Sequence, residues 1–109
     1  MKVIFTPQVT EYLDGLVEIL VLREYFGFME SAVRYVEDLA DSIKTTLPMC
    51  VHKPAPKHFD RYGKSMKYAT FRKSKHTCWY AFFKTYNKNG ETVFLVRHIA
   101  NNHIAAHYL

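Results

Sequence analysis

The sequence predicts an α+β fold in which a helical hairpin packs on one face of a mostly antiparallel sheet. Two observations lead to this prediction. Apolar residues recur at helical spacing in the first half of the chain, whereas beyond residue 65 they alternate with a period of two. The length of 109 residues suits one domain, and the apolar share of 49% is that of a globular protein. We therefore expect a single domain over residues 1–109 with the element order β-α-α-β-β-β.

The first strand and the helical hairpin occupy the N-terminal half. Residues 2–5 are a strand candidate, and the Thr6-Pro7 pair that follows suits the N-cap and first turn of a helix. Apolar side chains then recur at helical spacing over residues 9–20 and again over residues 32–47. A tight joint around Gly27 would make these two helices antiparallel.

Three further strands follow a long connection. Residues 48–65 contain three prolines and one glycine, and we expect them to be irregular. Beyond them, residues 66–72, 77–86 and 92–100 are rich in aromatic and β-branched side chains, which is typical of strands. The Asn-Gly pair within residues 87–90 predicts a hairpin between the last two strands.

The register of that hairpin decides which side chains face away from the helices. With a turn centred on Lys88 and Asn89, Tyr80 lies opposite Arg97, and His98 falls on the core side. The side chains that then cover the helices are Ala69, Phe71, Trp79, Ala81, Phe83, Phe94 and Val96. The opposite side, which we call the open face, carries Tyr68, Arg72, Tyr80, Lys84 and Arg97.

Charge is distributed unevenly along the chain. Residues 1–47 hold four Lys or Arg against eight Asp or Glu, a net charge of −4, whereas residues 48–109 hold eleven against two, a net charge of +9. Eleven aromatic residues and all six histidines share the basic part. Cations beside aromatic rings can neutralise phosphates and stack on unpaired bases, which favours nucleic acid or an acidic protein as the partner. A solvated face of cross-strand pairs that only stabilises the sheet is the alternative.

Several classes of chemistry are not expected. The basic part contains no glycine-rich phosphate loop, no pair of carboxylates and no nucleophile elbow. His103 and His107 have a spacing that can hold zinc, but no third ligand supports them, so we expect neither a metal nor another cofactor. The apolar run of residues 19–22 is far shorter than the about 20 residues that cross a bilayer. Without a visible signal peptide, we expect a cytoplasmic protein with no membrane partner, in which Cys50 and Cys78 are reduced thiols.

Five segments carry a resemblance to a known family. They are residues 24–27 (EYFG), 32–35 (AVRY), 66–72 (MKYATFR), 79–83 (WYAFF) and 93–102 (VFLVRHIANN). Together with the element order and the basic C-terminal sheet, they resemble the RelE/ParE superfamily of bacterial type II toxin–antitoxin toxins over essentially the whole chain. The resemblance implies a curved sheet with a concave open face. It also implies a bacterial cytoplasmic location and a cognate antitoxin that is acidic where it contacts the toxin.

The family includes two activities. RelE-like toxins enter the ribosomal A site and cut mRNA, whereas ParE-like toxins inhibit DNA gyrase without cleaving RNA. We expect the first activity: a ribosome-dependent mRNA endonuclease that inhibits translation without a metal. Two segments, Cys78–Tyr80 and Asn101–His103, differ from the arginine and histidine positions of many RNA-cleaving members. Two alternatives therefore stay open, a gyrase inhibitor and a decayed toxin that only binds its antitoxin.

The resemblance also implies roles for individual residues. Arg72 matches the family's arginine at the end of a strand, and Arg97 lies on the last strand, where basic residues recur. We expect Arg72 and Arg97 to stabilise the reacting phosphate and His103 or Tyr108 to transfer the proton. The residues expected to contact RNA are Lys64, Lys67, Lys73, Lys75, Tyr80 and Lys84.

Overall fold

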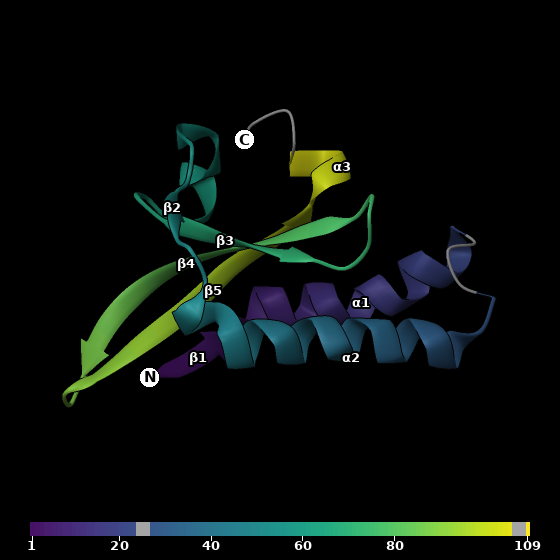
Figure 1. Ribbon diagram of the computed structural model, residues 1–109, viewed down its shortest axis with the longest axis horizontal. Coiled ribbons are helices and arrows are strands. Elements are labelled where there is room, and N and C mark those ends of the chain that lie inside the picture. Colours follow the sequence, from purple (N-terminus) through teal and green to yellow (C-terminus); the bar gives the residue numbers. More distant parts are fainter. Residues whose placement is uncertain (24–26, 106–108) are drawn as a thin grey trace.

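The computed structural model describes residues 1–23, 27–105 and 109 and confirms the predicted fold class. Two helices pack on one face of an open, mostly antiparallel sheet of five strands in the order β1-β5-β4-β3-β2 (Figure 1). Only β1 is parallel to its neighbour, β5. The strands are β1 (Lys2–Phe5), β2 (Lys53–Pro54), β3 (Lys67–Arg72), β4 (Cys78–Lys88) and β5 (Glu91–Asn101).

The helices α1 (Pro7–Leu22) and α2 (Met29–Thr46) form the predicted hairpin. The Thr6 hydroxyl accepts a hydrogen bond from the backbone N–H of Val9, at 3.3 Å, and so caps α1 as expected. Gly27 lies in the connection between the helices, while residues 24–26 of the predicted joint lie outside the described residues. The buried helical side chains are Val9, Leu13, Leu16 and Leu20 of α1 and Ala32, Val36, Leu39 and Ile43 of α2. No helix in the described part of the chain is long and apolar enough to span a membrane.

The alternation predicted most of the sheet side chains in the core between helices and sheet. Apart from His98, the residues expected on this side are all buried: Ala69, Phe71, Trp79, Ala81, Phe83, Phe94 and Val96. Trp79 is buried, and its polar indole N–H is satisfied there because it donates a hydrogen bond to the Tyr35 hydroxyl at 2.8 Å. This bond ties the central strand β4 to α2.

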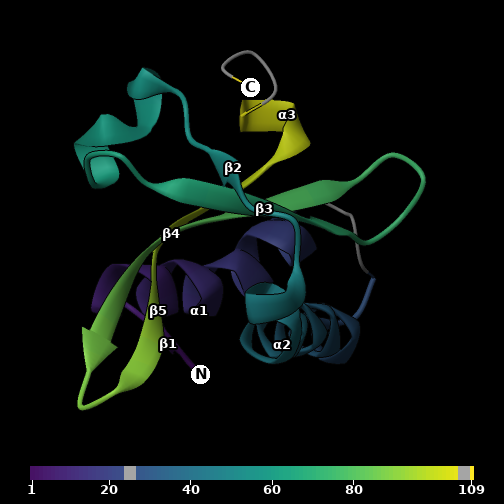
Figure 2. The ribbon, with the colours of Figure 1, turned by 60° about the vertical axis from the view of Figure 1, so that its left-hand side comes forward.

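The connection that we expected to be irregular is ordered and packs on the open face. It contains β2 and two 3-10 helices, η1 (Leu47–Met49) and η2 (Lys57–Tyr62). Figure 2 shows the helices below the sheet and the teal segment that contains η2 above it. Phe59 of η2 stacks on Phe82 of β4, with ring centroids 4.3 Å apart, and a second apolar cluster forms around this pair. The centre of the open face is therefore covered.

The register of the β4–β5 hairpin differs from the prediction. Its two-residue turn consists of Asn89 and Gly90, both with positive φ, and Lys88 pairs with Glu91. These two φ angles suit the primed turns that match the twist of paired strands, so the turn lies one residue later than assumed.

A β-bulge changes the register further along the hairpin. Phe83 pairs with Val96 and Phe82 with His98, which leaves Arg97 as the extra residue on β5. The predicted pair of Tyr80 with Arg97 is therefore wrong, since Tyr80 lies opposite Ala100. The predicted core position of His98 is also wrong: it lies opposite Phe82, on the open face.

Candidate nucleic-acid interface

The open face carries several basic side chains, and Asp60 of η2 is the one acidic residue of the connection that packs on it. Glu91, at the tip of the hairpin, is the only acidic residue within β3, β4 and β5. Among the described residues, no Lys or Arg of residues 48–109 forms an ion pair. Because Phe59 of η2 covers Phe82, the polar part of the face is divided into two patches.

The first patch lies at the end of β3. Arg72 is exposed there, and Thr70 pairs with Tyr80 on the neighbouring strand. The Tyr68 and Tyr80 rings meet edge to face, 6.0 Å apart. Burial raises the pKa of Tyr80, so its hydroxyl stays protonated at neutral pH. The patch thus offers one free guanidinium beside two aromatic rings.

The second patch lies at the bulge. The Arg97 guanidinium donates a hydrogen bond to the Tyr86 hydroxyl at 3.2 Å. This bond is the main reason why the pKa of Tyr86 is lowered, and the charge of Lys84 acts in the same direction. The Nε atom of Arg97 is buried without a hydrogen-bond partner among the described residues. Gly63 packs against the stem of Arg97, because a Cβ at this glycine would lie 3.0 Å from the Arg97 Cδ.

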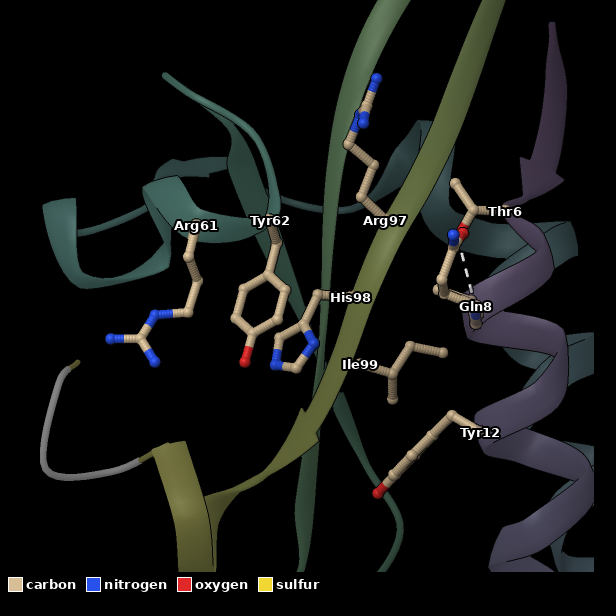
Figure 3. A pocket seen from close by; sticks show the side chains of 9 residues that line it. Thr6, Gln8, Tyr12, Arg61, Tyr62, Arg97, His98 and Ile99 are labelled. Carbon is tan, nitrogen blue, oxygen red and sulfur yellow. Dashed lines mark hydrogen bonds between the residues drawn. The ribbon is translucent and has the colours of Figure 1, made fainter.

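A pocket of about 350 Å³ adjoins this second patch (Figure 3). It exists because β1 accompanies β5 only as far as Val96, after which the chain turns into α1. The edge of β5 from Arg97 onward therefore faces the pocket instead of another strand. The lining residues are Thr6, Gln8, Val9 and Tyr12 near the start of α1, Arg61 and Tyr62 of η2, and Arg97, His98 and Ile99 of β5.

An aromatic pair forms one wall of the pocket. The Tyr62 ring lies flat on the His98 ring, with centroids 3.7 Å apart and an interplanar angle of 5°. Burial, together with the charge of His58, lowers the pKa of His98 to about 4. The imidazole is therefore neutral at neutral pH, and the pair presents flat, uncharged rings.

The residues expected to act together in catalysis are not brought together. Arg72 pairs with Cys78, whereas Arg97 lies opposite the step from Phe82 to Phe83, which is about 15 Å further along β4 at the usual rise per residue. The two guanidinium groups thus belong to different patches.

The two expected proton donors also lie elsewhere. His103 is exposed in the short helix α3 (Asn102–Ala105) and lines a second pocket, between α1 and the turn after β3. Its backbone N–H donates a hydrogen bond to the Asn101 side chain at 3.0 Å. Tyr108 lies outside the described residues.

The expected RNA-contacting lysines are spread over the surface. Lys73 and Lys75 belong to the turn between β3 and β4, where the Lys73 ammonium lies 5.1 Å from the centre of the Tyr35 ring. Lys64 is exposed between η2 and β3, and Lys84 is half-buried on β4. Lys67 is exposed but alternates with the core residues of β3, so it lies on the helix side.

Four residues of the interface were missed by the sequence analysis. Tyr86 could have been found, because it has the same strand parity as Lys84. His98 was assigned to the wrong side because the bulge leaves no local signal in the sequence. Arg61 and Tyr62 lie in a 3-10 helix, which is too short to show a period.

No group of three or more His, Cys, Asp or Glu side chains that could hold a metal lies within the described ranges, and His107 falls outside them. No protein-family model, curated protein or solved structure matches the chain.

Proposed function

We propose that this chain is a RelE/ParE-like toxin of a bacterial type II toxin–antitoxin system, which inhibits translation as a ribosome-dependent mRNA endonuclease. The observation that carries the proposal is the basic and aromatic open face, on which no Lys or Arg forms an ion pair among the described residues. A polyanion such as RNA gains most from such a face, because its phosphates replace bound counterions with fixed cations. A cognate antitoxin with acidic side chains would cover the same face and block it.

The cleavage would use the RNA itself as nucleophile. The 2′-hydroxyl attacks the adjacent phosphate and loses its proton, while the bond from phosphorus to the 5′-oxygen breaks and that oxygen gains a proton. Arg97 is suited to stabilise the charged phosphate, because Tyr86 and Gly63 hold its side chain in one position. Arg72 would bind the RNA backbone in the other patch. The proposed partners are mRNA, the ribosome and the antitoxin.

The test is brief induction of the chain without an antitoxin, followed by mapping of RNA 5′ ends. We expect new ends at fixed positions within translated codons, and none when ribosomes are kept off the message. Arg97→Ala should remove both the ends and the growth arrest while circular dichroism shows an intact fold. Arg34→Ala, which removes an exposed arginine from α2, is the matched control and should remain toxic. Unchanged mRNA during growth arrest would contradict the endonuclease.

A second candidate is a ParE-like inhibitor of DNA gyrase. The separation of Arg72 from Arg97 favours it, because protein binding needs a basic surface but no assembled catalytic group. This function predicts inhibition of purified gyrase in a supercoiling assay. In cells, it predicts a DNA-damage response with mRNA left whole.

A further inference from the structure

The Tyr62–His98 pair has the features of a stacking platform. One face of the Tyr62 ring lies on His98, yet the residue is still 37% exposed, so its free side is accessible from solvent. His98 in turn packs against Phe82 and Phe59, with ring centroids 5.5 and 6.2 Å away. The platform is therefore supported from beneath by a buried aromatic cluster. A rigid ring with one accessible face binds a flat ligand at little cost in conformational entropy.

Two arginines flank this platform. Figure 3 shows Arg61 next to Tyr62 and turned away from the ring pair, while the Arg97 side chain leaves β5 next to His98 and points away from the pair. Arg61 is exposed and has no ion pair within the described ranges, and Arg97 has a buried Nε atom without a partner there. None of the nine residues that line the pocket is acidic. The pocket therefore suits a ligand with a flat middle part, which would stack on the ring pair, and with negative groups at both ends, which would bind the two arginines.

We infer that this pocket holds one nucleotide of a single-stranded RNA, with its base stacked on Tyr62 and its two flanking phosphates at Arg61 and Arg97. A volume of about 350 Å³ is within the usual range for a small-molecule site and accommodates one nucleotide. Arg97 lines the pocket and also donates a hydrogen bond to Tyr86, so it connects the pocket to the second patch, over which the strand would continue. This inference rests on the RNA target of the proposed function and names the subsite that receives the strand.

The inference is tested with the purified chain and a fluorescein-labelled octauridylate RNA, by fluorescence anisotropy at several salt concentrations. Tyr62→Leu should weaken binding by about 5- to 150-fold, the usual effect of losing one stacked base, whereas Tyr62→Phe should retain the affinity. Arg61→Ala should lower the slope of log affinity against log salt by about 0.7, the contribution of one phosphate contact on a single strand. Arg34→Ala, an exposed arginine on α2, should change neither quantity. Denaturant unfolding of each variant checks that η2 remains packed.

Several results would overturn the inference. One is a wild-type chain that does not bind the RNA, and another is unchanged affinity in both Tyr62→Leu and Arg61→Ala. If inorganic phosphate or octaglutamate competes equally well and Tyr62→Leu has no effect, the pocket recognises charge alone and the base site is refuted. Other results distinguish the subsite from the proposed function. If RNA binding depends on Tyr62 but mRNA stays intact in cells, the subsite stands and the endonuclease is refuted. If the Tyr62→Leu variant cleaves mRNA as well as the wild type does, the endonuclease stands and the subsite is refuted.

Discussion

Replacing Gly63 by alanine should disturb both the stability of the fold and the position of Arg97. Gly63 has φ +155° and ψ 132°, at the end of η2, where the chain turns back toward β3. A Cβ at this position would lie 3.0 Å from the Arg97 Cδ and 3.2 Å from the Met66 Sδ. Alanine is therefore strained by its backbone and also forces two packed side chains to move.

The magnitude follows from two opposing effects. A non-glycine residue in such a sparsely populated backbone region costs about 1–3 kcal/mol. The loss of conformational freedom in the unfolded chain recovers about 0.4–1 kcal/mol for a Gly→Ala change. We expect a net loss of about 1–2 kcal/mol in the free energy of unfolding, to which the displacement of Arg97 and Met66 adds.

Guanidinium unfolding measures this loss, and titration of Tyr86 by NMR reports on Arg97. The pKa of Tyr86 is lowered mainly by its hydrogen bond to Arg97, so Gly63→Ala should raise it. The matched control is Gly90→Ala, because Gly90 also has positive φ, at +81°, but nothing lies within 4 Å of an added Cβ. That variant should lose stability without changing the Tyr86 titration. A Gly63→Ala chain with wild-type stability and an unchanged Tyr86 pKa would refute the reasoning.

Three further predictions concern other parts of the fold. Tyr35→Phe should lower the free energy of unfolding, measured in urea, by about 1–3 kcal/mol, because the buried indole N–H of Trp79 loses its hydrogen-bond partner. An unchanged free energy would mean that the bond does not contribute to stability. Gly15→Ala should raise the free energy of unfolding by about 1 kcal/mol, because alanine favours a helix more than glycine does and nothing lies within 4 Å of the added Cβ. A destabilised variant would contradict this. The pKa of His98 is lowered from 6.5 to about 4, so between these pH values the unfolded chain binds a proton that the folded chain does not. The free energy of unfolding should therefore fall as pH is lowered through this range, and His98→Gln should show a smaller fall; an equal fall would exclude His98 as its source.

Local patterns were sufficient to predict the main elements and the core. The helical period identifies α1 and α2, because each buries one continuous stripe of apolar side chains. The alternation in β3, in β4 and in β5 as far as Val96 identifies the core face, because neighbouring side chains of a strand point to opposite sides. The predicted cap at Thr6 is likewise formed within four residues. These features depend on contacts between residues close in the sequence or on a repeated pattern, so the sequence by itself determines them.

The candidate interface depended on the tertiary structure. Arg97 reaches Tyr86 because a bulge leaves it without a pairing partner on β4, between the paired residues Val96 and His98. A bulge is a property of two paired strands. Tyr62 reaches His98 across more than thirty residues of chain, because Phe59 and Phe82 anchor η2 on the open face. No local period records such contacts, since each short segment is held by a partner distant in the sequence. The sequence by itself determined the scaffold and its charge, while long-range packing decided which of the basic and aromatic side chains meet.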